Sequence, residues 1–571
     1  MRHKVNIKIA LLLTCMFLSA FGAKISAQSS TVYTIKGVVT DEFGKPLSGV
    51  VVNSETGKNG TSTDIEGSYI LTVDDGSKDI VFSYLGYKDK KVAIAEKETI
   101  DAKLEPDALK SDEIIDMGFV QQRRGAISGA VSSVKGTPIE AAPVSSFGAA
   151  MNGFVTNLMV RQNNYVLGNE TVSMLIRGAS NPQNGWQTPL IMIDGVMSSY
   201  NSNDVLRYLT AKEVESITLL KDASTQALYG VKGNAGVLVI TTKRGKAGEN
   251  KISYSGYLGT QKVDNPFEFL NAKDYMNLQN ALYQEIDGQE GNPNGVYTPS
   301  QLQSTVDTDW LDVCTRLALV QDHNIQFRGG SEKTKVLTSL GYYKQEGVLK
   351  NTDFNRISGR VNVDQTINDF IKAGATMYAH RERSNAQTYS GNILGENVML
   401  SVMEYDPTVK PYNEDGTYGR VPGGRGDNPL ANLLERKKEM VNDKFNGTAF
   451  LEVNPFDGFT AKATAGVELL HNFKGSYLPK STTYAGEIEG GIASTYDFRS
   501  TRQVFEGILN YMKTFNNIHD LNVMLGYSYE KYSAESRSAN GKGFSTDLFE
   551  WNNLGAASIK GVSSSKTENL L

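Results

Sequence analysis

The sequence predicts a mainly β protein, and composition, turn spacing and alternation of polarity all point that way. It holds 55 Gly, 27 Tyr and 22 Phe against only 15 Pro, which favours strands and turns over helices. Short apolar segments with frequent turn residues occupy the N-terminal part, and long segments of alternating polarity follow from about residue 251. With 571 residues, the chain is long enough for several domains.

The N-terminus has the pattern of an export signal. A basic stretch at residues 2–8 precedes an apolar run at 9–23, and this run is shorter than the ~20 apolar residues that a spanning helix needs. We expect residues 1–27 to be removed, with cleavage after Ala27. A lipoprotein signal that uses Cys15 and a core helix of a cytoplasmic protein are the alternatives. Cys314 is the one other cysteine, so no internal disulfide framework is expected.

Residues 28–105 predict a small β-sandwich. Strand candidates at 33–39, 50–52, 68–73 and 80–84 are separated by turn signals, a spacing typical of sandwiches. The pattern G-x-V-x-D-x-x-G-x-P-L-x-G-V, from Gly37 to Val50, resembles the carboxypeptidase-regulatory-like sandwich. That resemblance implies a module without catalysis, as any immunoglobulin-like sandwich would also be.

A linker at 106–118 and a mixed α/β region at 119–245 follow. The linker ends in a short extended segment, Asp112 to Gly118, which we expect to belong to neither neighbouring core. The α/β region has a helix candidate at 145–151 and strand candidates bounded by turns. These strand candidates are at 174–178, 189–196, 217–220 and 236–242.

The part from residue 251 onward predicts strands that cross a membrane. Apolar and polar residues alternate over 371–380, 459–469 and 521–529, and these runs have about the 9–11 residues that a transmembrane strand needs. Connections alternate between short turns and long loops, as in outer-membrane barrels. We therefore expect residues 251–571 to form part of a transmembrane antiparallel β-barrel. A large soluble β-sandwich is the alternative.

Several segments in order make the resemblance specific. The segments 175–178, 189–196, 213–224, 228–230 and 233–245, with 329–347 beyond them, resemble the SusC-like TonB-dependent transporters of Bacteroidetes. The resemblance implies that 119–245 is a plug inside the barrel and that the sandwich is an N-terminal extension in the periplasm. It assigns the following plug motif residues: Arg177, Gly178, Asp194, Gly195, Lys221, Asp222, Ala223, Tyr229, Gly230 and Gly236.

The segment at 112–118 lies where this family carries its TonB box. An extended segment can add as a strand to the periplasmic TonB sheet and so receive mechanical energy. Asp116 departs from the usual apolar run, which leaves the register open, and an inert linker is the alternative. The candidate box residues are Asp112, Glu113, Ile114, Ile115, Asp116, Met117 and Gly118.

The chain also departs from the family near its end. Outer-membrane transporters with a plugged lumen have about 22 strands, whereas we count about nine strand candidates here. The stretch Ser563–Asn569 is polar, and Leu571 is not the aromatic residue that usually ends a barrel. We therefore expect an incomplete barrel that belongs to the N-terminal portion of a longer protein.

The sequence offers no catalytic or cofactor motif. It contains no H-E-x-x-H, Walker or G-x-S-x-G pattern, and its five His are scattered. We expect neither an enzyme nor a cofactor nor a metal, and a net charge of −5 argues against nucleic acid as a partner.

The resemblance implies a location and partners as well. It places the protein in the cell outer membrane, in contact with outer-membrane lipid. The implied partners are TonB with its ExbB/ExbD motor, a SusD-like surface lipoprotein, and an oligosaccharide or peptide substrate. A receptor that signals ligand occupancy and a truncated, non-functional transporter are the alternatives.

Overall fold

The structure is a computed structural model that describes most of the chain from residue 32 to residue 570. The described residues exclude 55–59, 75–78, 85–86, 95–97, 106–112, 141–143, 145, 163–165, 169, 179–187, 199–205, 207–208, 266, 288–295, 386–397, 422–426, 481–483 and 516–518. The expected signal segment and its cleavage residue Ala27 lie outside the described residues. The chain divides into two compact units, residues 1–113 with 123–126 and residues 114–122 with 127–571.

The first unit contains a β-sandwich. Its sheets have the orders β4-β1-β7 and β3-β2-β5-β6, and their inward residues, such as Val39, Leu71 and Phe82, form one apolar core. Strands alternate between buried and exposed residues, as a two-layer sandwich requires. The strands are β1 (Val32–Thr40), β2 (Val51–Ser54), β3 (Gly60–Ser62), β4 (Ser68–Asp74), β5 (Asp79–Ser83), β6 (Lys90–Ala93) and β7 (Ala102–Lys103).

Within the second unit, residues 127–245 form an α/β region, which we call the plug region after the expectation above. Its five-stranded sheet has the order β10-β15-β16-β13-β14, and β11 and β12 form a separate pair. The strands are β10 (Val131–Lys135), β11 (Leu158–Gln162), β12 (Val172–Ile176), β13 (Leu190–Ile193), β14 (Val196–Met197), β15 (Val214–Leu220) and β16 (Val237–Thr242). Short helices α2 (Thr137–Glu140), α3 (Phe147–Ala150) and α5 (Ala223–Gln226) accompany them.

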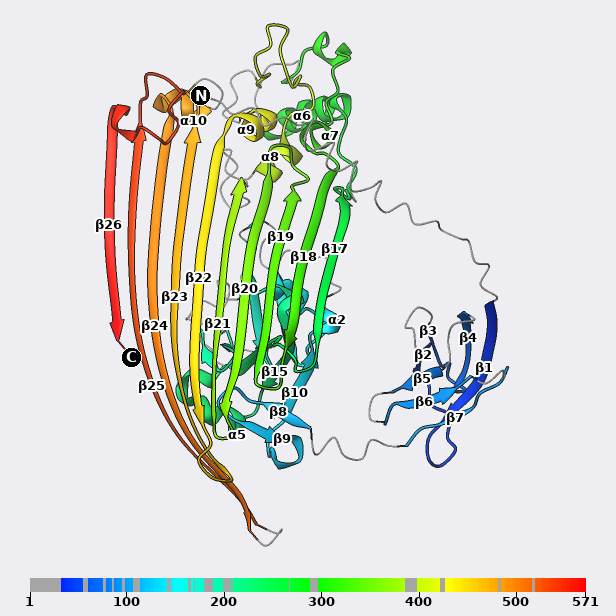
Figure 1. Cartoon of the computed structure of the whole chain (residues 1–571). Helices are drawn as coiled ribbons and strands as arrows, with labels where there is room; N and C mark the ends of the chain where they lie inside the picture. Colours follow the sequence, from blue (N-terminus) through cyan, green and yellow to red (C-terminus); the bar gives the residue numbers. More distant parts are fainter. Residues whose placement is uncertain are drawn as a thin grey trace, which may run out of the picture. The chain divides into compact units, whose positions relative to one another are not determined.

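The largest element is an antiparallel sheet of ten long strands, β17 to β26 in chain order, shown in Figure 1. The strands are β17 (Asn250–Gln261), β18 (Ala318–Gly330), β19 (Thr334–Glu346), β20 (Asp353–Asn368), β21 (Ile371–Asn385), β22 (Lys437–Val453), β23 (Phe459–Leu478), β24 (Ile492–Phe515), β25 (His519–Lys542) and β26 (Ile559–Leu570). The mainly β fold, with a plug region and a large antiparallel sheet, is confirmed.

The sheet has ten strands, close to the roughly nine candidates that the sequence suggested. The last strand, β26, contains the polar stretch 563–569 and pairs with β25 from Lys531 to Lys542. Its polar residues on both faces give no alternation with apolar residues, on which strand prediction depends.

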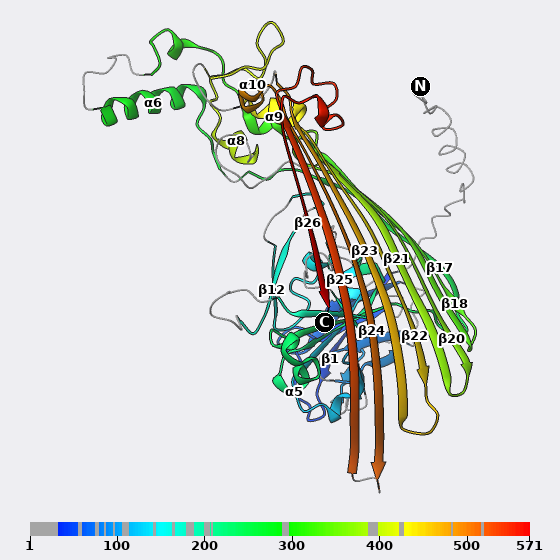
Figure 2. The same cartoon turned by 90° about the vertical axis from the view of Figure 1, so that its left-hand side faces the viewer.

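Helices gather at one end of the sheet, as Figures 1 and 2 show. They are α6 (Ala272–Asp287), α7 (Trp310–Cys314), α8 (Val398–Glu404), α9 (Pro429–Glu435) and α10 (Tyr484–Glu489). Tight turns at 331–333, 369–370 and 454–458 join strands at the opposite end. In the described part of the chain, no helix is both long and apolar enough to cross a membrane.

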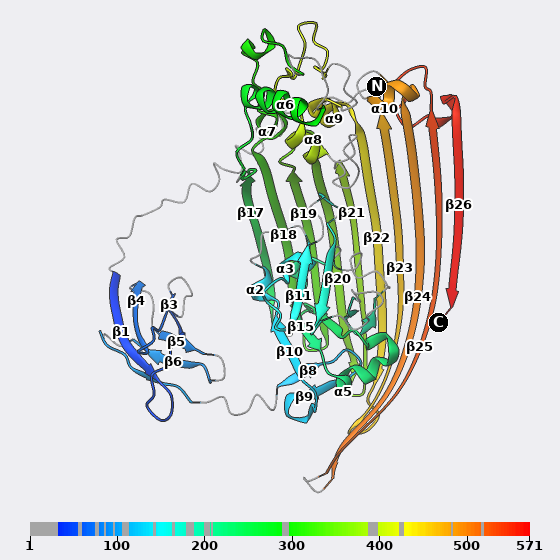
Figure 3. The ribbon, with the colours of Figure 1, turned by 180° about the vertical axis from the view of Figure 1, so that it is seen from behind.

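The two faces of the sheet differ in polarity, and the placement of the apolar and polar faces is the reverse of that in a soluble protein. The inner face lies against the plug region (Figure 3), and its buried polar residues include Asn324, Arg356, Arg360, His380, Glu382, Lys444, Arg502, Glu506 and Glu530. The outer face exposes large apolar residues, including Ile325, Leu340, Ile357, Met377, Leu451, Leu469, Phe505, Val523 and Leu525. Apolar residues that face outward and polar residues that face inward are typical of strands in a membrane.

Candidate functional site

The candidate TonB box is docked on the plug region. Ile114–Asp116 form β8, which pairs with β9 (Gln121–Arg123). Ile115 and Met117 are only 1% and 2% exposed and belong to an apolar cluster with residues of the plug sheet. The expectation that this segment belongs to neither core is therefore wrong. Its alternate residues are apolar, so one side of the extended chain can be buried.

The ends of the segment differ from its middle. Asp112 lies outside the described residues. Glu113 makes an ion pair with Arg124, with 2.8 Å between Glu113 Oε2 and Arg124 Nε. Ile114 points away from the cluster and is 57% exposed.

Tyr229 holds the docked segment in place. Its hydroxyl donates a hydrogen bond to the Met117 carbonyl, and its ring stacks on Phe119 with 5.0 Å between centroids. Burial raises the pKa of the Tyr229 hydroxyl, so the group stays protonated and can donate at neutral pH. The segment turns at Gly118, where φ is +85° and an added Cβ would lie 2.1 Å from Met192 Sδ. Only glycine fits both the conformation and the space.

Asp116, the residue that departs from the family pattern, faces inward to polar partners. Its carboxylate accepts hydrogen bonds from the Gly118 N–H at 2.8 Å and from the Thr241 hydroxyl at 3.1 Å. Burial raises the pKa of Asp116, and these two hydrogen bonds oppose that rise. The carboxylate therefore ties the segment to β16 as well as to its own turn.

Two plug motif residues, Arg177 and Asp222, connect β12 to the end of β15. The Arg177 guanidinium donates to the Asp222 carboxylate and to the Lys221 carbonyl at 3.3 Å. The Ala130 N–H also donates to Asp222. That N–H and the Arg177 guanidinium hold the pKa of Asp222 below its usual range. Lys221 donates to Ser132 Oγ at 2.7 Å, and Ala223 begins α5.

Asp194 and Gly195 form a two-residue turn between β13 and β14. Both have positive φ, +50° and +85°, as a type I′ hairpin turn requires. The Asp194 carboxylate accepts from the Thr242 N–H at 2.8 Å and from the Thr242 hydroxyl at 2.6 Å. It lies 3.5 Å from Arg244 Nη2. This turn therefore fixes the end of β16 next to β13.

The other motif glycines occupy backbone positions with positive φ. These are Gly178, Gly230 and Gly236. At Gly236 an added Cβ would lie 2.4 Å from Ile176 Cδ1, so this residue lets β12 approach the start of β16. The motif residues thus shape the plug region and its turns.

Sequence reasoning missed the ion pairs between plug and sheet. Glu213 ends the 3-10 helix Ala211–Glu213 and lies 3.3 Å from Arg360 Nε of β20, with the two side chains 2% and 4% exposed. Ser339 Oγ donates to the same carboxylate at 3.3 Å. Glu213 begins the segment 213–224, but its contact depends on a partner 147 residues away.

A second contact of this kind lies on β24. Arg502 pairs with Glu530 of β25 at 2.7 Å and donates to the carbonyl of the plug residue Met197 at 2.8 Å. On β22 and β23, Lys444 and Glu468 lie 3.3 Å apart. A signal was available for Glu468, because it lies on the polar side of the alternating segment 459–469.

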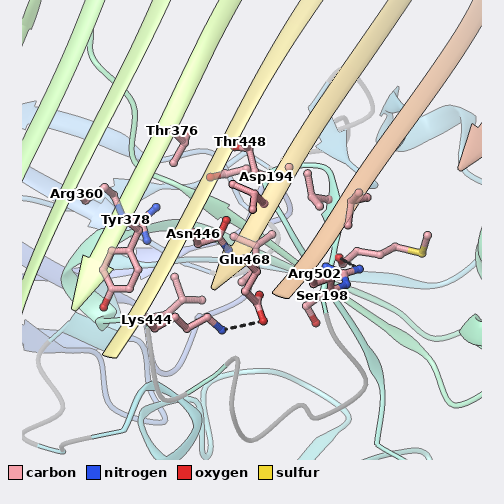
Figure 4. Close-up of a pocket in the computed structure, with 17 residues that line it drawn as sticks. Asp194, Ser198, Arg360, Thr376, Tyr378, Lys444, Asn446, Thr448, Glu468 and Arg502 are labelled. Atoms are coloured by element: carbon pink, nitrogen blue, oxygen red, sulfur yellow. Dashed lines mark hydrogen bonds and ion pairs between the residues drawn. The ribbon is translucent and has the colours of Figure 1, made fainter. Parts of the chain in front are cut away.

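Figure 4 shows the space between these groups. Arg360, Tyr378, Lys444, Glu468 and Arg502 face it from the sheet, and the plug residues Asp194, Met197 and Ser198 face it from the other side. The cavity volume is small, about 60 Å³. Within the described residues, no three His, Cys, Asp or Glu side chains are placed to hold a metal ion. The arrangement consists of ion pairs and hydrogen bonds between the plug region and the sheet.

Comparison with known proteins assigns both N-terminal domains. Residues 35–115 match the CarboxypepD_reg-like domain, and residues 124–237 match the TonB-dependent Receptor Plug Domain. The TonB-dependent receptor P26 of Formosa agariphila is 30% identical over 531 residues, 91% of this chain and 51% of the relative. The TonB-dependent receptor SusC of Bacteroides thetaiotaomicron is 28% identical over 73% of this chain and 42% of its own length.

Solved structures show the same fold. The structure of the RagAB peptide importer in its open-open state matches with a TM-score of 0.67 at 23% identity, over 80% of this chain and 54% of that chain. A structure of the RagAB peptide transporter matches with a TM-score of 0.64 at 22% identity, over 78% and 52%. The chain spans about half the length of the curated relatives it matches. Over that span, the chain is similar to the SusC-like TonB-dependent receptors and carries their plug domain.

Proposed function

We propose that the protein takes part in TonB-dependent import of an oligosaccharide or peptide across the outer membrane, together with a SusD-like lipoprotein. In this proposal the large sheet is part of the membrane-embedded wall, and its outer face meets outer-membrane lipid. The plug blocks the lumen, and the sandwich at 28–105 lies in the periplasm. The matched relatives are about twice as long as this chain, so the proposal concerns the whole transporter.

The observation that carries this proposal is the reversed polarity of the sheet combined with a plug held by charged groups. An apolar outer face is stable in lipid but costly in water. The inner contacts are ion pairs and hydrogen bonds, such as Glu213–Arg360 and Arg502–Met197. When the plug moves, water can replace the hydrogen-bond partners of these polar and charged groups. An apolar interface would instead expose hydrophobic side chains to water.

The docked segment at 113–118 gives force a path into the plug. TonB would add a strand to this segment through main-chain hydrogen bonds. Ile115 and Met117 anchor the segment in the apolar cluster. Tyr229 connects it to the 3-10 helix Ala227–Gly233 before β16, and Asp116 connects it to β16 itself. Tension applied to this segment would therefore be transmitted to the plug sheet and would not be taken up by a flexible linker.

The test is nutrient uptake by the bacterium that encodes the protein. The parental strain should take up labelled oligosaccharides or peptides, and deletion of codons 112–118 should abolish that uptake. The matched control is Arg381→Gln on the outer face, 69% exposed, which should leave uptake unchanged. Outer-membrane abundance is measured in parallel. Uptake that persists at the parental rate after the deletion would contradict the coupling role.

Binding to TonB is measured separately. The purified chain should capture the periplasmic C-terminal domain of TonB, and the 112–118 deletion should not. Equal capture of TonB by the full chain and by the deletion variant would mean that TonB binds another part of the protein.

A further inference from the structure

Lys462 of β23 extends from the inner face of the sheet toward the docked segment. A Cβ placed on Gly195 would lie 3.9 Å from Lys462 Nζ and 3.5 Å from the Gly118 carbonyl oxygen, so the ammonium lies beside the turn that ends the segment. The Asp116 carboxylate accepts a hydrogen bond from the N–H of the same Gly118 at 2.8 Å. Burial raises the pKa of Asp116, and Lys462 is one of the groups that oppose this rise. The ammonium therefore attracts the carboxylate of the docked segment.

The ammonium of Lys462 is not held by a carboxylate while the segment is docked. Glu452 is directly opposite on β22, but its Oε1 lies 3.5 Å from Lys372 Nζ. Lys462 Nζ lies instead 5.0 Å from the centre of the Phe450 ring, and it has no ion-pair partner within the part of the chain that the structure describes. A cation over a ring is held weakly compared with one in a buried ion pair, so this ammonium can change its position.

Glu506 of β24 is a second carboxylate within reach of Lys462. Lys462 is opposite Ile508 in the β23–β24 ladder, and Glu506 is two residues from Ile508, on the same face of the strand. Such diagonal neighbours are about 7–8 Å apart, a distance that a long side chain can span. Glu506 is only 2% exposed. A buried carboxylate is stabilised by a nearby ammonium.

The other charged groups around Glu506 are already paired. They include Arg502 and Glu530, which lie 2.7 Å apart, and Arg502 also donates to the Met197 carbonyl at 2.8 Å. The Met197 N–H points toward the Glu506 carboxylate, but neither carboxylate oxygen completes a hydrogen bond within the described residues. An additional donor would therefore find both oxygens of Glu506 available.

A cavity leaves room for such a donor. Glu506 lines a cavity of about 500 Å³ together with Phe119 and Tyr229, the two stacked rings beside the docked segment. The space next to the Glu506 carboxylate thus adjoins the residues that hold the segment in place. A change at the segment and a change at Glu506 can occur together.

We propose that Lys462 is a positioning residue whose ammonium exchanges one carboxylate for another when the segment is pulled, an inference that rests on the transport function above. In the docked state the ammonium attracts Asp116 and helps to hold the segment. When tension removes Asp116, the ammonium pairs with Glu506, so neither group is left buried with an unpaired charge. Glu506 therefore competes with Asp116 and eases release of the segment through Lys462.

The test measures amide hydrogen exchange of residues 114–118 in the purified full chain in detergent. Lys462→Met removes the attraction and should speed this exchange on the order of fivefold, the size expected for a partly exposed charge pair, and Lys462→Arg should restore the parental rate. Glu506→Gln removes the competitor and should slow the exchange by a similar factor. Glu535→Gln on the outer face of β25, 46% exposed, is the matched control and should leave the rate unchanged. Unchanged exchange in Lys462→Met would overturn the proposal.

A double variant decides whether Glu506 acts through Lys462. In the Lys462→Met background, Glu506→Gln should have no further effect on exchange at residues 114–118, because the effects of a coupled pair are not additive. Slowing of the same size in both backgrounds would mean that Glu506 acts through packing alone and would overturn the proposal. Lys462→Gln serves the same comparison if Lys462→Met does not fold. Exchange in β17 to β22 is followed in every variant to detect a global loss of stability.

Capture of the TonB domain is measured on the same preparations. Capture by the parental chain, with unchanged exchange in Lys462→Met, would remove only the present inference and leave the transport proposal standing. The expected exchange rates without capture by the parental chain would contradict the coupling role and leave the contact between Lys462 and the segment assigned.

Discussion

The docked segment and the plug are held by opposite kinds of contact. Ile115 and Met117 anchor the segment in a small apolar cluster, whereas ion pairs such as Glu213–Arg360 hold the plug against the sheet. Apolar burial resists separation at every step, while charged groups can exchange one partner for water or for another charge. In the proposed mechanism, the firm contact is then at the point where force would enter, and the exchangeable contact is at the surface that would slide.

The largest effect is expected from breaking the buried plug–sheet pair. Glu213→Ala leaves the Arg360 guanidinium, 4% exposed, without its partner, and removal of one member of a buried pair costs about 3–5 kcal/mol. Urea titration should show this as a lower free energy of unfolding, with earlier proteolysis of the plug.

The matched variant is the double change Glu213→Leu with Arg360→Met, which removes both charges. It should recover much of the loss, because no charge is then buried alone. A double variant as unstable as Glu213→Ala would mean that the pair itself, rather than the unpaired arginine, supplies the stability.

A smaller but local effect is expected at the anchor. Met117→Ala removes a side chain that is 2% exposed and should cost about 2–3 kcal/mol through lost burial and a cavity. Hydrogen exchange should increase at residues 114–118 and not in the large sheet. Exchange that rises equally in both regions would mean that the anchor is not separate from the rest of the unit.

Tyr229→Phe tests the hydrogen bond alone. The ring keeps its stacking on Phe119, but the Met117 carbonyl loses its donor, which should cost about 1–2 kcal/mol. The amide exchange of residues 114–118 should rise less than in Met117→Ala. A larger rise than in Met117→Ala would reverse the order of apolar and polar contributions at the anchor.

Asp116 should give the weakest effect, visible as pH dependence. Its pKa is raised in the folded state, so the proton is bound more tightly when the segment is docked. Docking is then favoured at acidic pH and weakens as pH rises from the unfolded-state value, about 3.9, through the raised value. The exchange of residues 114–118 should therefore increase over this window, and Asp116→Asn should remove the increase. If the pH dependence of exchange at residues 114–118 is unchanged in Asp116→Asn, other carboxylates cause it.

The sequence predicted what depends on local pattern and missed what depends on distant partners. The strands at 371–380, 459–469 and 521–529 were found because their residues alternate, whereas the Asp194–Gly195 turn lay inside the strand candidate 189–196. The order of motifs led to the family. The burial of Ile115 and Met117 could not be foreseen, because it requires Tyr229 more than a hundred residues later.

The order of apolar and charged side chains on the outer face of β21 predicts how deep each residue of the strand lies in a bilayer. Its apolar run from Ile371 to Ala379 is followed by Arg381, which pairs with Asp443 at 2.6 Å. Nine residues of strand extend about 30 Å, and a tilt near 40° reduces this to roughly 23 Å, close to the ~25 Å height of the apolar band in outer-membrane barrels. A spin label at Met377 should therefore report hydrocarbon and one at Arg383 the headgroup layer, so the sheet can be placed in the bilayer residue by residue.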